Sequence, residues 1–214
     1  MSWYPADIQS CDLATWEYSK KDKHFWPPPA SVPFDAKLII DAGCNAGFST
    51  GLLAEGWPLA RVVGIEMNPE TAARGAANVA NMGPRVSVTQ AALGYPARWS
   101  HYTDTSASAV NALTDYPRDT GVVKPIAIHT LDEVLDDLGL ADQQIDFLKL
   151  DIEGAEKELL AGGGAWVERT RVIVCEVHFW AITGDELVSE LKRLGFADAR
   201  HEDRKVVFEV VGTK

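Results

Sequence analysis

Leu-Ile-Ile-Asp-Ala-Gly-Cys-Asn-Ala-Gly-Phe-Ser-Thr, residues 38–50, is the stretch of this chain that decides its fold. The apolar run that ends at Asp41 predicts a strand, the small residues from Gly43 to Gly47 predict a tight turn, and the following residues predict a helix. Glycine lets the backbone bend sharply and approach a ligand that a Cβ atom would keep away. Strand, glycine-rich turn and helix N-terminus together are typical of sites for nucleotide-like ligands. Which ligand is bound depends on the residues that follow.

Strands and helices alternate along the rest of the chain. Apolar runs predict strands at residues 37–41, 61–66, 85–91, 124–129, 145–150 and 171–177. Shorter strands are expected near 98–102 and 107–111, and β-like runs at 196–201 and 205–211 are close enough to pair as a hairpin. The alternation predicts an α/β protein with a doubly wound, mostly parallel sheet whose last strand is antiparallel. Ligands of such sheets bind at the carboxyl ends of the strands.

Three helix starts carry clear capping signals. Asn68-Pro69-Glu70 places an N-cap, a proline at the first helical position and an acid in the first turn. Residues 130–133 and 183–186 each form the Thr-x-x-Glu capping box. Helices are therefore expected to begin at these three places.

The first 35 residues lie outside this alternation. Aromatic residues occur there at positions 3, 4, 16, 18, 25 and 26, followed by the triplet Pro27-Pro28-Pro29. Successive prolines favour extended backbone and end a preceding helix. Residues 1–35 are therefore expected to form an arm or cap, and residues 36–214 a single domain. The arm either packs on the outside of the fold or covers the substrate site, because aromatic side chains serve both purposes.

Length and composition limit the classes of protein to consider. The 214 residues fit one domain with or without a small cap, and 46% of them are apolar, as in globular proteins. A formal net charge of −11 argues against a nucleic-acid surface and against an anionic membrane. No run approaches the ~18 apolar residues of a membrane span, and the first residues lack the pattern of a signal peptide. We therefore expect a cytoplasmic protein without a nucleic-acid or membrane partner.

The cysteines agree with a reducing compartment. Cys11, Cys44 and Cys175 are odd in number and widely spaced, so a disulfide framework is not expected. Cys44 lies in the glycine-rich turn, where it is either a nucleophile or a small residue that fills the turn. The second interpretation is preferred, because buried free cysteine usually behaves as a small apolar residue.

Carboxylates end the first two predicted strands. Asp41 ends the first strand, and Glu66 ends the second, where an acid accepts hydrogen bonds from ribose hydroxyls unless it is only a surface carboxylate. The turn reads Gly43-x-Asn45-x-Gly47, which departs from the G-x-G-x-x-G fingerprint that leaves room for a pyrophosphate. Asp41 would repel a pyrophosphate but suits an ammonium or sulfonium charge. The spacing therefore favours S-adenosylmethionine over NAD.

Residues beside these acids are candidates for contact with the base of the ligand. Met67 follows Glu66 and either packs on a purine face or belongs to the core. The third strand ends in Gln90, Ala91 and Ala92, where backbone N–H groups and small side chains could meet an adenine edge. These residues complete the predicted cofactor-binding set.

Charged residues end two later strands that are otherwise apolar. Lys149, Asp151 and Glu153 alternate at the end of one strand, and Glu176 and His178 alternate at the end of the next. Charges at the end of a buried strand are costly unless they are paired or used. If the strands are neighbours, these side chains converge on one binding or catalytic site. The alternatives are a helix N-cap for either acid, an ion pair for the lysine and a hydrogen-bonded structural histidine.

Five segments carry a family resemblance. They are residues 41–50 (Asp-Ala-Gly-Cys-Asn-Ala-Gly-Phe-Ser-Thr), 64–69 (Gly-Ile-Glu-Met-Asn-Pro), 130–135 (Thr-Leu-Asp-Glu-Val-Leu), 147–156 (Phe-Leu-Lys-Leu-Asp-Ile-Glu-Gly-Ala-Glu) and 176–178 (Glu-Val-His). In order and spacing they resemble the FkbM-type S-adenosylmethionine-dependent methyltransferases, over roughly residues 37–180. The resemblance implies a Rossmann-like class I methyltransferase fold, with a seven-stranded, mostly parallel sheet in the order 3-2-1-4-5-7-6 and an antiparallel last strand.

The resemblance also implies roles for individual residues. The methionyl part of the cofactor would contact Asp41, Gly43, Asn45 and Gly47, the ribose hydroxyls Glu66, and the adenine residues 90–92. Asp151 would lie near the transferable methyl group. The family is similar to enzymes that O-methylate hydroxyls of sugars and polyketide-like natural products, so a small-molecule hydroxyl acceptor is the expected partner.

Methyl transfer to oxygen is an in-line displacement, so the protein must align the acceptor and remove its proton. His178 is the leading candidate for the general base, Asp151 and Glu153 are alternates, and Lys149 would orient a carboxylate. In a variant of this mechanism a divalent metal binds Asp151, Glu153, Glu176 or His178, because such ligand sets allow it. The metal-free mechanism is preferred.

Other functions remain open at this point. An NAD-dependent oxidoreductase would bind a nicotinamide cofactor, and a non-catalytic protein with the methyltransferase fold would bind its ligand without turnover. N- or C-methylation is also compatible with the sequence.

Overall fold

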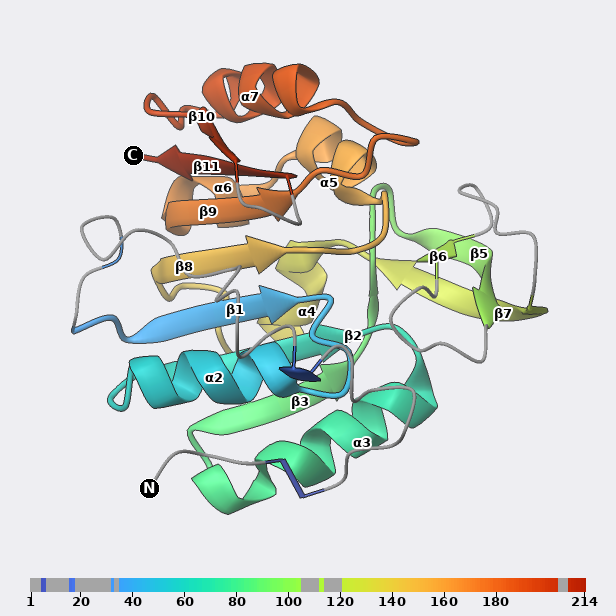
Figure 1. Ribbon diagram of the computed structural model, residues 1–214. Helices are drawn as coiled ribbons and strands as arrows, with labels where there is room; N and C mark the ends of the chain where they lie inside the picture. Colours follow the sequence, from blue (N-terminus) through green and yellow to red (C-terminus); the bar gives the residue numbers. More distant parts are fainter. Residues whose placement is uncertain are drawn as a thin grey trace.

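The computed structural model (Figure 1) describes residues 5–6, 16–17, 32, 35–104, 112–113, 121–203 and 208–214. These residues form two sheets and a set of helices. The expected strand at 107–111 and most of the expected arm fall outside the described residues.

The main sheet has seven strands in the order β10-β11-β9-β8-β1-β2-β3. Their bounds are β1 (Leu38–Ala42), β2 (Arg61–Glu66), β3 (Val86–Gln90), β8 (Ile145–Leu150), β9 (Thr170–Glu176), β10 (Arg200–Asp203) and β11 (Phe208–Thr213). Neighbouring strands are parallel, except that β11 runs antiparallel to both β9 and β10. Counted along the chain within this sheet, the order reads 3-2-1-4-5-7-6. The expected α/β class with a mostly parallel sheet is confirmed.

A second, smaller sheet has the order β4-β7-β5-β6. Its strands are β4 (Ala92–Leu93), β5 (Arg98–Asp104), β6 (Ala112–Leu113) and β7 (Val122–His129). The strands predicted near 98–102 and at 124–129 both lie in it and pair antiparallel with each other. Figure 1 shows this sheet on the side toward which the arrows of β1 and β8 point. The sequence did not separate the two sheets, because strand periodicity does not say which strands pair.

Helices begin where the capping signals predict them. The described helices are α2 (Phe48–Gly56), α3 (Pro69–Val79), the 3₁₀ turn η1 (Ala80–Met82), α4 (Leu131–Asp137), α5 (Glu156–Gly162), α6 (Ala165–Arg169) and α7 (Gly184–Arg193). The Asn68 side chain caps α3 by accepting from the backbone N–H groups of Glu70 and Thr71, and both Thr-x-x-Glu boxes are formed. None of the helices in the described part of the chain is long and apolar enough to cross a bilayer.

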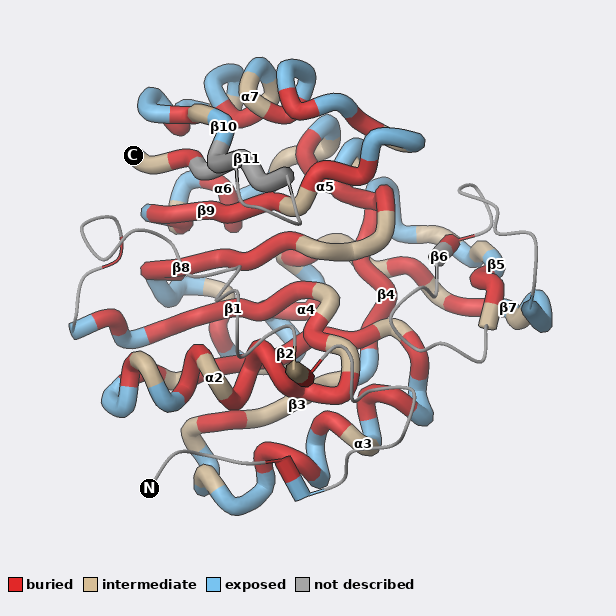
Figure 2. Tube along the Cα trace, viewed as in Figure 1, coloured by how far each residue is buried: buried red, intermediate tan, exposed pale blue. Residues whose placement is uncertain are grey.

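The central strands β1 and β8 are buried along their whole length. Ile39 and Phe147 belong to the core cluster shared with α2 and α3, whereas Ile40 and Leu148 belong to the cluster shared with α4–α7. Successive side chains of a strand point to opposite faces, so one strand supplies both clusters. Figure 2 shows the buried strands between helices whose outer surfaces are exposed. This rigid centre fixes where the carboxyl ends of β1, β8 and β9 lie.

Few residues of the expected arm are described. Trp16 is 1% exposed, and its ring centroid lies 5.7 Å from that of Phe48 at the start of α2. Val32 is buried in the core cluster on the α2 side. These contacts place Trp16 and Val32 against the domain on the side of α2.

Candidate functional site

The turn after β1 is held against two neighbouring strands. Gly43 has a φ of 78°, and its N–H and that of Cys44 both donate to the carbonyl of Ile65, at 2.9 and 3.1 Å. A Cβ atom on Gly43 would lie 1.6 Å from the carbonyl oxygen of Asp151. Gly47 also has a positive φ, 78°, and lies directly before α2. Glycine at the first of these positions is therefore required for the turn to lie against the end of β8.

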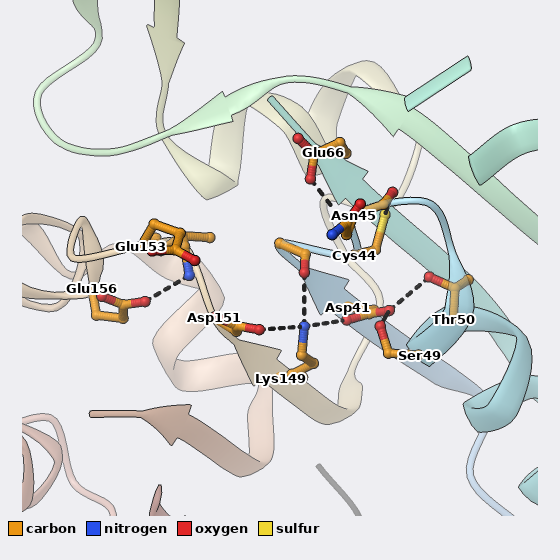
Figure 3. Close-up of polar contacts among 12 residues, drawn as sticks. Asp41, Cys44, Asn45, Ser49, Thr50, Glu66, Lys149, Asp151, Glu153 and Glu156 are labelled. Carbon is orange, nitrogen blue, oxygen red and sulfur yellow. Dashed lines mark hydrogen bonds and ion pairs between the residues drawn. The ribbon is translucent and has the colours of Figure 1, made fainter. Parts of the chain in front are cut away.

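Asp41 lies beneath this turn and is fully buried. One of its carboxylate oxygens accepts hydrogen bonds from the hydroxyls of Ser49 and Thr50, both at 2.6 Å. The other lies 3.0 Å from the ammonium nitrogen of Lys149, which is directly opposite on β8. Figure 3 shows Asp41 between the start of α2 and Lys149. The contacts of the predicted cofactor ligand Asp41 in this structure are thus with the protein's own side chains.

Lys149 connects three parts of the site. Its buried Nζ donates to the carbonyl of Gly43 at 2.8 Å and lies 3.0 Å from Asp41 and 3.4 Å from Asp151. Burial would lower the pKa of this ammonium, but the carboxylates of Asp41 and Asp151 outweigh burial and raise the pKa above its ordinary value. Lys149 is therefore charged and holds the turn, β1 and the end of β8 together (Figure 3).

Glu66 orders the other side of the turn. Its carboxylate accepts hydrogen bonds from the backbone N–H groups of Asn45, at 3.1 Å, and Asn68, at 2.9 Å. Asn45 itself has a positive φ of 50°. Burial raises the pKa of Glu66 to about 7, and the two backbone hydrogen bonds act against that shift. Asn45 and Glu66, each predicted to bind the cofactor, are therefore in direct contact.

The residues expected to face adenine lie beside Glu66. Gln90 donates from its side-chain amide to the carbonyl of Met67 at 3.0 Å, and the N–H of Ala91 donates to the carbonyl of Glu66 at 3.0 Å. Met67 also packs against the cluster of the second sheet that contains Ala92. All four residues are near one another, and their contact with adenine stays a prediction.

A second group of charged residues gathers at the ends of β8 and β9. Nε2 of His178 lies 3.8 Å from a carboxylate oxygen of Asp151 and 3.9 Å from one of Glu153. The ligand atoms of these three residues lie within 4.8 Å of one another, so they could hold a metal ion. Three of the four predicted metal candidates are therefore brought together.

Glu156 belongs to this group although the sequence interpretation gave it no role. It is fully buried, and Oε1 lies 3.2 Å from Nδ1 of His178. The same carboxylate accepts from the N–H groups of Ile152 at 2.6 Å and Gly154 at 2.9 Å. The available signal was its place as an acid in the first turn of α5, a pattern that also fits an ordinary exposed helix start.

The neighbouring carboxylates shift the pKa of His178. Burial acts to lower the pKa of His178, but Glu156, Asp151 and Glu176 outweigh it and raise the pKa to about 10. The role of His178 as the general base stays a prediction. Glu176, in turn, has a raised pKa because of burial and the nearby Asp151.

Cys44 and two exposed aromatic residues complete the surroundings. Burial and the neighbouring carboxylates of Asp41 and Glu66 raise the pKa of the Cys44 thiol well above its ordinary value, which suits a residue that fills a turn and not a nucleophile. Phe179 and Trp180 follow His178 and are more than half exposed, at 58% and 56%. The Trp180 ring centroid lies 4.8 Å from that of His178. The sequence interpretation did not single out these two aromatic residues.

The chain resembles known proteins in sequence and in fold. The model of the FkbM methyltransferase domain matches residues 41–197, which include the glycine-rich turn and both charged groups. The chain belongs to the FkbM methyltransferase family. The family that the motifs resemble is thereby confirmed, and with it a methyltransferase domain of the S-adenosylmethionine-dependent type.

Curated relatives match parts of this FkbM domain. The chain is 29% identical over 160 residues to the 2-O-methyltransferase NoeI of Sinorhizobium fredii, covering 65% of this chain and 62% of the relative. It is 28% identical over 214 residues to the AMB antimetabolite synthetase AmbE of Pseudomonas aeruginosa, covering 80% of this chain but 10% of the relative. A trans-aconitate 2-methyltransferase of an Azoarcus strain is 52% identical over 42 residues, or 17% of its length. The chain thus spans less than two thirds of each of these relatives.

Solved structures share the fold. A precorrin-6y C5,15-methyltransferase from Geobacter metallireducens superimposes with a TM-score of 0.54 at 14% identity, covering 98% of this chain and 94% of the other. The methyltransferase SibL gives a TM-score of 0.52 at 12% identity, covering 94% of this chain and 56% of the other. At these identities the likeness establishes the class I methyltransferase fold alone.

Proposed function

We propose that this FkbM domain transfers the methyl group of S-adenosylmethionine to a hydroxyl group of a sugar or a similar small natural product. The position of Lys149 carries the proposal. Its contacts with Gly43, Asp41 and Asp151 join the turn expected to bind the cofactor to the cluster expected to handle the acceptor. A methyltransferase needs its cofactor and acceptor groups fixed relative to each other, because in-line displacement depends on alignment.

The cofactor would bind along the carboxyl ends of β1, β2 and β3. Glu66 would accept hydrogen bonds from the ribose hydroxyls, and Asn45, Gly43 and Gly47 would present backbone to the methionyl part. Asp41 would act differently from the role that the resemblance implies. With its oxygens engaged by Ser49, Thr50 and Lys149, it would position the turn instead of contacting the ligand. Met67, Gln90, Ala91 and Ala92 would border the adenine.

The acceptor proton would pass to a carboxylate of the second cluster. Asp151 and Glu153 have side chains that are 20% and 19% exposed, so an acceptor can reach them. The oxygen–hydrogen bond breaks and the carboxylate takes the proton, while the oxygen–carbon bond forms as the sulfur–carbon bond breaks. The neutral thioether S-adenosylhomocysteine leaves with the electron pair. His178, whose Nε2 lies 3.8 Å from Asp151 and 3.9 Å from Glu153, would help to position the two carboxylates.

The choice of a hydroxyl acceptor rests on a relative. The printed name of NoeI describes a 2-O-methyltransferase, and it aligns with 65% of this chain. Two carboxylates in the cluster also suit an acceptor whose proton must be removed, since an alcohol does not react with a sulfonium at neutral pH without such help. The formal net charge of −11 does not favour a nucleic-acid acceptor.

Calorimetry on the full chain tests the cofactor. Titrations with S-adenosylmethionine, S-adenosylhomocysteine and NAD should show saturable binding of the first two and none of NAD. Methyl transfer is then measured with S-adenosylmethionine that carries a deuterated methyl group. The acceptors are tested in pairs, one with a hydroxyl group and the other with an amine at the same position. A product with the label on oxygen is the expected result. NAD binding alone would overturn the proposal in favour of an oxidoreductase, and cofactor binding without transfer to any acceptor would favour a non-catalytic binding protein.

A further inference from the structure

We propose that Asp151, Glu153 and His178 form a binding site for one divalent first-row metal ion, represented experimentally by Mn²⁺. Metal binding by this chain does not depend on the methyltransferase assignment. The use of the ion, which is to bind and acidify the acceptor hydroxyl, rests on the proposed function.

The spacing of the three side chains supports an ion. Nε2 of His178 lies 3.8 and 3.9 Å from oxygens of Asp151 and Glu153, which is too far for a direct hydrogen bond. Ligand atoms about 2.1 Å from an octahedral ion lie about 3 Å apart when adjacent and about 4 Å apart when opposite. All three ligand atoms of the cluster lie within 4.8 Å of one another. A shift of less than about 1 Å per pair would therefore complete the coordination of an ion.

The orientation of His178 is the second observation. The residue is 3% exposed, and its Nδ1 lies 3.2 Å from the fully buried carboxylate of Glu156. With Nδ1 on the side of Glu156, Nε2 is the ring nitrogen on the side of Asp151 and Glu153. A histidine that binds metal through one nitrogen usually donates from the other to a carboxylate, which fixes the ring. A buried histidine–carboxylate pair that directs a ring nitrogen between two acids is the arrangement of such a ligand.

Glu156 also fixes the backbone that carries the acids. Its oxygens accept from the N–H groups of Ile152 at 2.6 Å and Gly154 at 2.9 Å, on either side of Glu153. Glu153 itself has a φ of 55°, so its side chain leaves a sharply turned segment. The same buried carboxylate thus holds two of the three proposed ligands.

The donor set indicates the class of ion and its chemistry. Two carboxylate oxygens and one imidazole nitrogen suit Mn²⁺, Fe²⁺, Co²⁺ or Zn²⁺ better than Mg²⁺ or Ca²⁺, which prefer oxygen ligands alone. Three protein ligands leave coordination positions for the acceptor oxygen. An ion there lowers the pKa of the hydroxyl, so that its proton can leave to water before the oxygen attacks the methyl group. Asp151 and Glu153 then act as ligands.

Metal binding is measured on the full chain after EDTA treatment and dialysis. Mn²⁺ is titrated and followed by electron paramagnetic resonance of the free ion, without cofactor or acceptor. We expect one saturable site. Affinity should fall at least about tenfold in H178A and E153Q, and about tenfold in E156Q, where only the orientation of the ring changes. His201, which pairs on the surface with Asp185 at 2.9 Å, provides the matched control, and H201A should bind Mn²⁺ like the wild type.

Two results would overturn the metal site. One is the absence of saturable binding of both Mn²⁺ and Zn²⁺ to the wild type, and the other is an equal affinity in wild type, H178A and E153Q. Because H178A and E156Q alter buried groups, their circular dichroism and S-adenosylmethionine binding are measured as well. Glu153 is partly exposed, so E153Q still tests the site if H178A or E156Q does not fold. Methyl transfer that is undiminished in EDTA would show that the ion has no role in the reaction. Mn²⁺ binding without binding of S-adenosylmethionine would contradict only the proposed function.

Discussion

Two groups of charged residues lie near the ends of β1 and β8. They differ in how closely their side chains are paired and in how deeply they are buried. The contacts of Asp41 with Ser49, Thr50 and Lys149 and that of Lys149 with Gly43 are short, between 2.6 and 3.0 Å, and Asp41 and Lys149 are buried. Around His178 the contacts to Asp151 and Glu153 are 3.8 and 3.9 Å, and the two acids are partly exposed. The first group holds the turn, whereas the two acids of the second group are partly exposed, so a ligand can reach them. Charged residues in one motif can therefore serve stability and chemistry separately.

The largest expected effect is on stability, from loss of the charge at Lys149. K149M leaves Asp41 buried with one oxygen unpaired, so the free energy of unfolding should fall by about 3–5 kcal/mol. Urea unfolding measures it. Lys124, which pairs with Asp104 on the second sheet and is 41% exposed, is the control, and K124M should cause a much smaller loss. Equal losses in the two variants would show that burial does not distinguish the two ion pairs.

A large loss of turnover without loss of cofactor is expected from the second group. E153Q should lower kcat about a hundredfold, because the proton can no longer be removed or the hydroxyl acidified. The Kd for S-adenosylmethionine should stay close to that of the wild type. Glu158, which pairs with Arg98 at 2.8 Å on the same segment of chain, is the control, and E158Q should keep its kcat. A matching loss of cofactor affinity in E153Q would show that Glu153 also supports cofactor binding, so that the two groups of charged residues do not act separately.

A smaller effect concerns pH and Glu66. Burial raises the pKa of this carboxyl to about 7, and the ionised form is the one that accepts hydrogen bonds from ribose hydroxyls. Affinity for S-adenosylhomocysteine should therefore rise as the pH increases through about 7. For folding of the free protein the sign is opposite, because a raised carboxyl pKa stabilises the folded state at low pH and this contribution is lost as the pH rises.

Calorimetry across that pH range, with E66Q, tests this role. The variant should bind the cofactor product about tenfold more weakly than the wild type at high pH and lose the pH dependence. Glu190, which pairs with Arg193 at 2.8 Å on α7, gives the control E190Q, expected to follow the wild type. A pH dependence that persists in E66Q would assign the titration to another group.

The smallest effect is expected at Trp180. Its ring lies 4.8 Å from that of His178 and is more than half exposed, so it can stack on an acceptor held at the cluster. W180A should raise the KM for the acceptor about threefold to tenfold, with little change in cofactor affinity. Trp99 on β5, which is 78% exposed, is the control, and W99A should leave KM unchanged. An equal rise in both variants would remove the specific role of Trp180.

Whether a contact could be predicted from the sequence depended on how far apart its residues lie along the chain. The starts of α3, α4 and α7 followed from Asn68 and the two capping boxes, because a cap involves residues only two or three positions apart. The hydrogen bond of Lys149 to Gly43 joins residues 106 positions apart, and the sequence offered no pattern for it. The contact of Glu156 with the ring of His178 was missed for the same reason, since these residues meet only in the folded chain.

By itself, the sequence determined the glycine-rich turn, the alternation of strands and helices, the FkbM family and the strand ends at which charges gather. Those features follow from local periodicity, capping and motif order, which are written in neighbouring residues. Only the tertiary structure decided that a second sheet exists, that Asp41 lies opposite Lys149, and that His178 lies between Glu156 and two further acids. Strand register and packing set these contacts, and both depend on residues far apart in the chain.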